Sequence, residues 1–483
     1  MRIASIDQGT TSTKALIVTD DGGRNDVGNL HHQQILPRAG RVEHDAQELL
    51  ANVRMLIDQA ASQGIDGIAL ANQGETVVAW DRLTGRTLAN AIVWQDQRTE
   101  PDIAQLEASG KTQYVKAVSG LPLDSYFSAS KLKWLLDNAE GARDLARKGR
   151  LGLGTTDAYF LERLTGRYAT DVTTASRTSL MDLSACCWDA GLCEIFKVPV
   201  ELLPEVVADA EPFGTVVTSA GPKPLITSVV DQIAALYGHG CRKKGEGKVT
   251  VGTGAFGLFL TGFERPSDLM GGALPTAAWQ TRFGRSYAAD GGVYTAAAAI
   301  EWLIRIGLMA EAGELANLSG ATAASRDLFF VPALSGLACP HWDRRAVGLF
   351  IGMDTATERQ DLVKATVEGV AFRVAEVIDT LRLGENAEAP IPIDGGLTRS
   401  SYFLQFLADV MSCPVAVPED TELTAVGAAG LALAVSSGTD PHDFPTQHRV
   451  ARLVSPNAPA AEAQAFRGRF AEARLRAEGW RQR

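Results

Sequence analysis

The first stretch of the chain contains a short apolar run, a polar turn and a second apolar run. The first run covers residues 3–6 and ends at Asp7, and the second extends from Lys14 to residue 18. Gly9 and a series of hydroxyl residues separate the two runs, so the pattern predicts a β-hairpin with a polar tip. The same pattern returns at residues 248–263, again with a glycine–threonine turn. This internal repeat predicts two domains that each open with such a hairpin, with both tips facing a common cleft.

Between the two hairpins the pattern predicts alternating strands and helices. Apolar residues recur at helical spacing after Asp45, which predicts a helix that Asp45 caps. Three apolar runs then predict short strands of one sheet, whose polar ends could line a cleft, at residues 65–71, 76–80 and 91–94. Further helices are expected near residues 131–137, 157–164 and 192–196.

A buried strand is predicted at residues 225–230, and Asp231 begins the helix that follows and ends near residue 238. We expect the domain boundary within this helix, which gives a first domain of residues 1–236 and a second of residues 237–483. In the second domain, strands are expected at residues 328–331 and 391–393, the latter leading directly into Asp394 and two glycines. Helices are expected at residues 295–306, 359–381, 424–435 and 460–474, of which the last two would close the second domain.

Composition narrows the possible partners. The 483 residues carry a net charge of −11 with a pI near 5.3, which argues against nucleic acid or an anionic membrane as the main partner. No apolar run is long enough to cross a bilayer, and the start has no secretory pattern. The six cysteines are scattered, without disulfide or zinc spacing, so we expect reduced thiols in a cytoplasmic protein.

Two groups of residues suggest chemistry. At the first hairpin tip, Thr10, Thr11 and Ser12 present hydroxyl and amide groups that could surround a phosphate, although an ordinary tight turn explains them equally well. Asp231 follows a buried strand, where it could be a helix cap or a general base that takes a proton from a hydroxyl, with Gln232 beside it. Neither a Walker-type phosphate loop nor a nucleophile elbow occurs.

The chain resembles the FGGY family of carbohydrate kinases. Residues 126–138 (YFSASKLKWLLDN) match the first signature of that family, and residues 348–368 (GLFIGMDTATERQDLVKATVE) match the second. Stretches such as IDQGTTSTK (6–14), AIVWQDQRT (91–99), TDVTTASRTSL (170–180) and VGTGAF (251–256) are most similar to its glycerol kinase branch. The resemblance implies an α/β, two-domain fold like that of actin, hexokinase and the Hsp70 ATPase (ribonuclease H-like), with ATP and substrate in the interdomain cleft.

The resemblance also implies roles for individual residues on the ATP side. It assigns Thr10, Thr11, Ser12 and Lys14 of the first hairpin, and Thr253 of the second, to the phosphates, with Asp7 near Mg²⁺. Gly396 and Ser400 would lie by the adenosine. Ala297 and Glu301 match two further nucleotide positions, although the family usually has Gly and Gln there, and Lys14 stands where many members have arginine.

On the acceptor side the resemblance assigns Glu75, Tyr126, Asp231 and Gln232 to polyol hydroxyls, with Trp94 and Phe256 as apolar walls and Asp231 as general base. Gly74 is a departure, because glycerol kinases of the familiar type carry arginine before this glutamate. Losing a charged hydrogen-bond donor costs on the order of 1.5–3 kcal/mol, and the vacated space would suit a longer acceptor. Another arginine, such as Arg98, could compensate.

The expected function is therefore ATP-dependent phosphorylation of a small polyol, glycerol first, giving glycerol 3-phosphate. A tetritol, pentitol or ketose is the alternative acceptor because of Gly74. A non-catalytic nucleotide switch, like actin or Hsp70, is the alternative of another class. The resemblance further implies a homodimer or homotetramer.

Overall fold

The computed structural model describes residues 1–208, 212–266, 269–382, 389–445 and 449–481. The predicted first hairpin is confirmed, since β1 (Arg2–Gln8) pairs antiparallel with β2 (Ser12–Thr19). The hairpin belongs to a six-stranded sheet in the order β13-β14-β5-β1-β2-β3. The other strands of this sheet are β3 (Arg24–His31), β5 (Gly67–Asn72), β13 (Gly214–Thr218) and β14 (Gly221–Val230).

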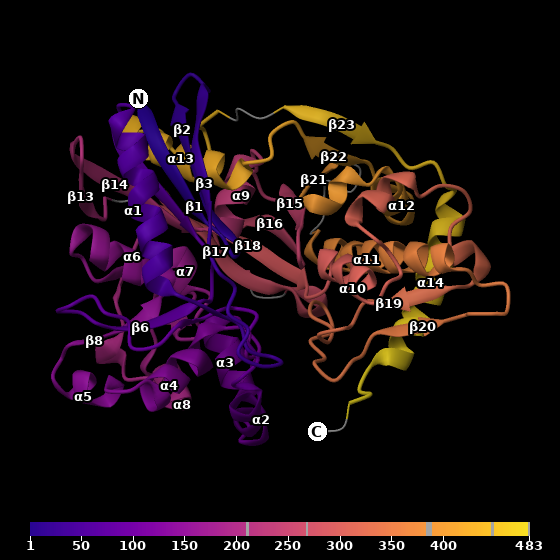
Figure 1. The fold of residues 1–483 in the computed structure, drawn as a ribbon, viewed down its shortest axis with the longest axis horizontal. Coiled ribbons are helices and arrows are strands. Elements are labelled where there is room, and N and C mark those ends of the chain that lie inside the picture. The colour runs from indigo at the N-terminus through magenta and orange to yellow at the C-terminus, as the bar shows by residue number, and fades with distance from the viewer. Residues whose placement is uncertain (209–211, 267–268, 383–388, 446–448, 482–483) are drawn as a thin grey trace.

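A second sheet repeats this design beside the first (Figure 1). Its hairpin strands β15 (Gly247–Val251) and β16 (Ala255–Gly262) are antiparallel, and β15 runs parallel to β21 (Ile391–Asp394) as β1 does to β5. The order is β17-β18-β16-β15-β21-β22-β23, with β17 (Leu274–Thr281), β18 (Gly284–Val293), β22 (Val415–Pro418) and β23 (Val450–Val454). The predicted repeat therefore extends beyond the hairpin to its parallel neighbour.

The prediction that residues 65–94 form strands of one sheet is wrong. β5 lies in the six-stranded sheet, whereas the next two strands enter a separate four-stranded sheet. That sheet has the order β4-β7-β6-β8, with β4 (Glu43–His44), β6 (Val77–Asp81), β7 (Ala91–Ile92) and β8 (Leu151–Thr155). The chain changes sheets between β5 and β6, where Glu75 has a left-handed backbone with φ of 57°.

The remaining strands form two-stranded pairs: β9 (Ala169–Asp171) with β12 (Glu205–Val207), β10 (Met181–Asp182) with β11 (Cys187–Trp188), and β19 (Phe329–Val331) with β20 (Leu349–Ile351). Helices pack on the sheets of both halves. Those of the first half are α1 (Ala46–Ser62), α2 (Glu100–Ala108), α3 (Thr112–Ser119), α4 (Ser128–Asn138), α5 (Ala142–Arg147), α6 (Thr156–Thr165), α7 (Val172–Ala175) and α8 (Ala190–Phe196). Those of the second half are α10 (Ala297–Arg305), α11 (Arg359–Leu381), α12 (Ser401–Met411) and α14 (Ala460–Ala477). Asp45 caps α1 as predicted, by accepting from the Gln47 N–H at 2.9 Å.

Two helices lie between the two sheets, α9 (Asp231–Gly238) and α13 (Leu423–Ser437). Helix α13 was predicted to close the second domain, but it packs on α9 and on β1 and β5 of the first sheet (Figure 1). Its apolar residues surround it on all sides, so it is buried between both bodies. The two helices approach closely through glycine, since a Cβ at Gly427 would lie 1.7 Å from the Ala234 carbonyl oxygen.

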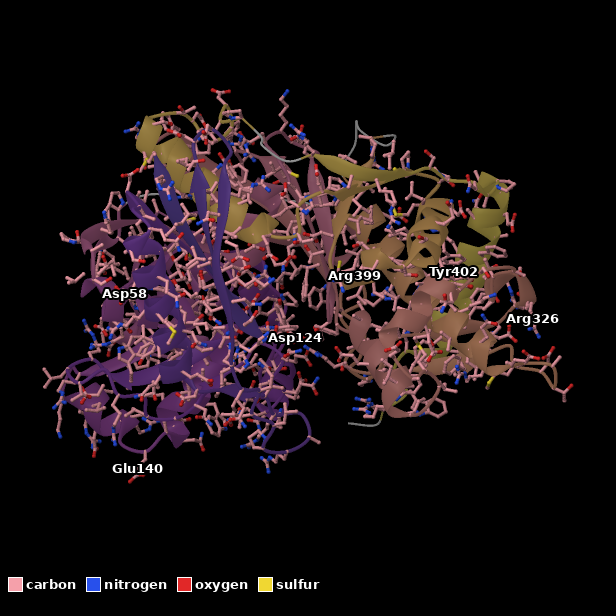
Figure 2. The ribbon with its side chains drawn as sticks, turned by 45° about the horizontal axis from the view of Figure 1, so that its top comes forward. Asp58, Asp124, Glu140, Arg326, Arg399 and Tyr402 are labelled. Atoms are coloured by element: carbon pink, nitrogen blue, oxygen red, sulfur yellow. The ribbon has the colours of Figure 1, made fainter. Side chains whose placement is uncertain are left out.

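A polar contact also joins the two bodies away from these helices. Asp124, labelled in Figure 2 where the bodies meet, accepts from the Arg344 guanidinium at 2.6 and 3.0 Å and from the Tyr294 hydroxyl at 2.9 Å. Burial raises the pKa of Asp124, but the charge and hydrogen bonds of the Arg344 guanidinium outweigh that effect and keep the pKa below its usual range. Within the described part of the chain, no helix combines the length and apolarity needed to cross a membrane.

Candidate active site

A cavity of about 90 Å³ lies between the two bodies and contains every residue predicted for the acceptor side. Two of its walls come from neighbouring parallel strands, since β5 and β14 pair with Asn72 opposite Val230 and both end at the cavity. Carboxyl ends of parallel strands are where open α/β sheets bind ligands. The lining residues are Thr10, Gln73, Gly74, Glu75, Trp94, Tyr126, Arg177, Val230, Asp231, Gln232, Ile233, Phe256, Leu258, Thr276 and Asp290.

Asp231 is the first residue of α9, directly after β14. Its carboxylate accepts from the Gln232 backbone N–H at 2.6 Å. Burial raises the pKa of Asp231 to about 7, and the neighbouring Glu75 carboxylate adds to the rise. A carboxylate with a pKa near the working pH suits proton abstraction from a hydroxyl.

Gln232 is held by a residue that the sequence analysis did not single out. The buried Lys248 ammonium on β15 donates to the Gln232 Oε1 at 2.5 Å and to the Thr250 Oγ1 at 2.8 Å. Burial lowers the pKa of Lys248. Because the amide oxygen of Gln232 is occupied, its NH₂ group is the part left to serve a ligand.

Three aromatic rings form an apolar wall. The Trp94 ring lies 5.7 Å from both the Tyr126 and the Phe256 rings, in edge-to-face geometry. The Trp94 indole N–H also donates to the Thr10 hydroxyl at 3.1 Å. This contact links the wall of the acceptor cavity to the tip of the first hairpin.

Six of the nine predicted nucleotide residues lie at or next to the two hairpin tips. Thr10, Thr11 and Ser12 form the first tip, which closes through a Gly9 N–H to Ser12 carbonyl bond of 3.0 Å. At the second tip the carbonyls of Gly252 and Thr253 accept from the N–H groups of Ala297 and Ala296, both at 2.9 Å. A Cβ at Gly395 would lie 2.4 Å from the Val251 carbonyl oxygen, so Gly396 follows a segment that packs closely against this tip.

Three predicted nucleotide residues have other partners or lie apart. The Lys14 ammonium contacts the carboxylate of Glu422, the residue just before α13, at 2.9 and 3.1 Å. Ser400 caps α12, accepting from the Phe403 N–H at 3.3 Å. Glu301 is exposed on α10.

Asp7 on β1 is the predicted metal ligand. Burial raises its pKa to about 7, with Asp231 and Glu422 adding to the rise and Lys14 opposing it. Neighbouring carboxylates that hinder each other's ionisation suit a divalent cation, and Mg²⁺ commonly uses one or two carboxylates together with substrate phosphates. Within the described ranges no group of three or more His, Cys, Asp or Glu residues could hold a metal ion.

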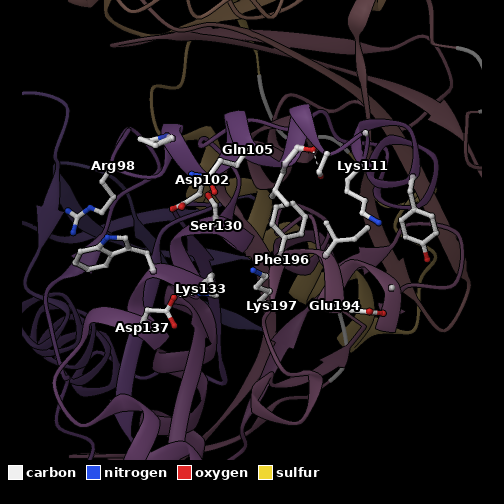
Figure 3. Close-up of a pocket in the computed structure, with 18 of the residues that line it drawn as sticks. Arg98, Asp102, Gln105, Lys111, Ser130, Lys133, Asp137, Glu194, Phe196 and Lys197 are labelled. Atoms are coloured by element: carbon white, nitrogen blue, oxygen red, sulfur yellow. Dashed lines mark hydrogen bonds and ion pairs between the residues drawn. The ribbon is translucent and has the colours of Figure 1, made fainter. Parts of the chain in front are cut away.

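Arg98 does not supply the charge missing at Gly74. Its guanidinium donates to Asp96 at 2.7 and 2.8 Å and to Glu43 at 2.6 Å, and Arg98 does not line the acceptor cavity. Arg98 lies instead at one end of a larger cavity of about 1020 Å³ on the first body (Figure 3). That cavity holds none of the predicted site residues.

Arg177 is the arginine that lines the acceptor cavity, and the sequence analysis did not single it out. Its Nε donates to the Glu75 carboxylate at 2.7 Å, and its Nη2 contacts Asp290 of β18 at 2.8 Å. Arg177 lies in the stretch TDVTTASRTSL, which the sequence analysis matched to the family. That match did not assign a role to any single residue of the stretch.

Comparisons with known proteins extend over the whole chain. Residues 2–238 match the N-terminal domain and residues 247–436 the C-terminal domain of the FGGY family of carbohydrate kinases. A glycerol kinase of Koribacter versatilis is 39% identical over 492 residues, covering 99% of this chain and 98% of that protein. The structure of Plasmodium falciparum glycerol kinase with ADP superposes with a TM-score of 0.87 at 30% identity, covering 99% and 98% of the two chains. A gluconate kinase from Lactobacillus acidophilus reaches 0.84 at 21% identity, covering 98% and 96%, so this level of likeness shows the fold alone.

Proposed function

The chain belongs to the FGGY family of carbohydrate kinases, and we propose that it transfers the γ-phosphoryl group of ATP to glycerol, giving glycerol 3-phosphate. One observation carries the proposal: all the predicted acceptor residues line one small cavity that also contains the tip of the first hairpin. A rival reading as a non-catalytic nucleotide switch has no support, because the family consists of kinases and the acceptor cavity is present.

In this proposal Asp231 is the general base that accepts the proton of the attacking hydroxyl. Glu75, Tyr126 and Gln232 bind the acceptor hydroxyls, and Trp94 and Phe256 cover its carbon chain. Phosphoryl transfer needs little covalent help from a protein, so positioning of the acceptor against the phosphate accounts for most of the catalysis.

The hairpin tips hold the nucleotide in this proposal. Their hydroxyl and amide groups bind the polyphosphate, and Lys14 leaves Glu422 to join them. Asp7 would hold Mg²⁺, which neutralises charge on the phosphates. The proposed nucleotide residues are Thr10, Thr11, Ser12, Lys14, Thr253, Ala297, Glu301, Gly396 and Ser400.

The cavity supports a small, neutral acceptor. Its volume of about 90 Å³ is well below the ~300–1,000 Å³ of sites that take drug-sized ligands. Three carboxylates line it, Glu75, Asp231 and Asp290, against the single guanidinium of Arg177. An acidic acceptor would add a further negative charge, so a polyol is favoured over a sugar acid.

A longer polyol or ketose is a second candidate, which the space beside Gly74 favours. An ideal Cβ at Gly74 meets only the Val230 side chain, at 3.5 and 3.7 Å. These are ordinary contacts, so a side chain would fit here and a larger acceptor can use the same space.

Three further proposals concern the whole molecule. The two domains comprise residues 1–236 and 237–483, which the family matches ending at 238 and starting at 247 support. The protein acts in the cytoplasm, which its six cysteines support, because all of them are free in the structure. It forms a homodimer or homotetramer, as the family resemblance implies, and light scattering of the purified protein tests this.

The direct test is ADP release with ATP and Mg²⁺ against glycerol, erythritol, xylitol and xylulose. We expect the highest kcat/KM for glycerol, and a longer acceptor that performs better would contradict the choice of glycerol. Asp231→Asn should lower kcat by about 10²–10⁴-fold with ATP affinity retained. The matched control is Asp189→Asn, which alters the cap of α8, where Asp189 accepts from the Leu192 N–H at 2.7 Å. Full turnover by Asp231→Asn would contradict its role as base.

A further inference from the structure

Arg177 lines the acceptor cavity, and its guanidinium has one unused donor. The side chain is 8% exposed. Nε donates to Glu75 at 2.7 Å and Nη2 contacts Asp290 at 2.8 Å. Nη1 is buried and has no hydrogen-bond partner among the residues that the structure describes.

An unused donor of this kind needs an explanation. Buried polar groups in folded proteins are nearly always hydrogen-bonded, because leaving one unpaired loses its bonds to water without replacement. Arginine cannot resolve the problem by losing its proton, and it has no acceptor atom. A hydroxyl oxygen of a molecule held in the neighbouring cavity is the kind of acceptor that Nη1 lacks.

The two carboxylates also fix the direction of the guanidinium. Glu75 precedes β6 of the first body, and Asp290 lies on β18 of the second, so the two ion pairs hold Arg177 from both sides of the cavity. A planar fork anchored at two nitrogens has little freedom left for the third. Nη1 is thus a positioned donor.

We infer that Arg177 is a specificity-determining residue, whose Nη1 donates a hydrogen bond to one hydroxyl of the acceptor. The inference rests on the proposed function. Gly74 carries no side chain that could make this bond, and Arg98 is committed to Asp96 and Glu43. Because Glu75 and Asp290 already offset the charge of Arg177, its partner is a neutral hydroxyl and not a carboxylate or phosphate.

The test is a double-mutant-type cycle, in which one change removes the Nη1 donor from the protein and the other removes one hydroxyl group from the acceptor. The wild type and Arg177→Lys are compared on glycerol, propane-1,2-diol and propane-1,3-diol by kcat/KM. Lysine keeps the positive charge between the carboxylates but has a single nitrogen in place of the three-nitrogen fork, so it loses the donor fixed in the position of Nη1. We expect the wild type to lose about 10- to 100-fold on the diol that lacks the contacted hydroxyl, and Arg177→Lys to lose less than about a third of that factor.

Arg98→Lys is the matched control, because it makes the same change in another buried guanidinium that pairs with two carboxylates and lies outside the acceptor cavity. It should discriminate between glycerol and the diols as the wild type does. Equal discrimination by the wild type and Arg177→Lys would overturn the inference and leave Arg177 with a structural role only.

Two further measurements keep the outcome decisive. If Arg177→Lys does not fold, Asp290→Asn takes its place in the cycle. Asparagine still offers an acceptor for Nη2 but removes the charge that holds the guanidinium. Unchanged discrimination between glycerol and the diols in Asp290→Asn would overturn the inference. Calorimetric binding of glycerol and the diols without ATP repeats the cycle without turnover. If the wild type binds glycerol more tightly than the diols but transfers no phosphoryl group, only the proposed function is contradicted. If phosphoryl transfer occurs but the wild type and Arg177→Lys discriminate equally between glycerol and the diols, only the role of Arg177 is contradicted.

Discussion

The contact between α9 and α13 gives a prediction whose size follows from the structure. In Gly427→Ala the new Cβ would lie 1.7 Å from the Ala234 carbonyl oxygen and 2.7 Å from the Gly238 backbone nitrogen. Both neighbours are backbone atoms, so no side chain can turn aside. An ordinary contact starts near 3.4 Å, which means that the helices must separate by about 1.7 Å.

This separation has a cost in stability and in activity. Overpacking costs about 1–3 kcal/mol, and a rigid backbone neighbour favours the upper end. Alanine regains about 1 kcal/mol of helix propensity, so we expect a net loss of about 2 kcal/mol of unfolding free energy. Because α9 begins at Asp231, the shift also displaces the base, and a misplacement of this order can lower kcat by about 10²-fold.

The assay is urea unfolding together with kcat at saturating ATP and acceptor. The matched control is Gly468→Ala in α14, where a Cβ meets nothing within 4 Å. The control should be more stable than wild type by about 0.4–1 kcal/mol with kcat unchanged. If Gly427→Ala matches the control in both measurements, the close packing of α9 on α13 does not control the position of Asp231.

Two other predictions concern groups of the acceptor cavity. Because burial raises the pKa of Asp231 to about 7, this carboxylate becomes protonated and cannot act as a base as the pH falls through that value. We therefore expect kcat/KM to decline below about pH 7 and to level off above it. A pH profile that stays flat down to about pH 5.5 would contradict the assignment of Asp231 as base. Lys248→Met should raise the KM for the acceptor by about 10-fold with a smaller change in kcat, since Gln232 loses its 2.5 Å contact. The control is Lys364→Met, because Lys364 is a buried lysine that does not line the cavity and donates to the Ala321 carbonyl at 2.8 Å. An equal rise in the acceptor KM in both variants would show a general effect of losing a buried lysine.

The sequence was informative where structure is set locally. The two hairpins, β14 followed by α9, and α11 at residues 359–381 agree with the predictions because hydrophobic periodicity and turn residues determine them. Sheet membership was not predictable in the same way. β5 and β6 are five residues apart and belong to different sheets, because pairing depends on strands from elsewhere in the chain.

The part of the site that the sequence did not predict depends on contacts between residues far apart in the chain, as sheet membership does. Glu75 and Asp231 stand at strand ends, a local signal that could be read, whereas the roles of Arg177 and Lys248 arise from contacts that no local pattern contains. Arg177 contacts Glu75 across 102 positions, and Lys14 contacts Glu422 across 408. Helix α13 was misplaced for a related reason, since an apolar surface on all sides does not indicate which of two domains will cover it.

The charges at the cavity connect acceptor binding to the joining of the two bodies. Arg177 comes from the first body and Asp290 from the second, so their ion pair forms only when the bodies meet over the cavity. Closing over an empty cavity leaves Nη1 buried without a partner, which opposes closure. If Arg177 has the role inferred above, an acceptor hydroxyl on Nη1 would remove that penalty, and bound acceptor would favour the closed form. The same contact would then select the acceptor and reduce ATP hydrolysis in its absence, because the closed arrangement needed for transfer forms mainly with a hydroxyl already beside Asp231.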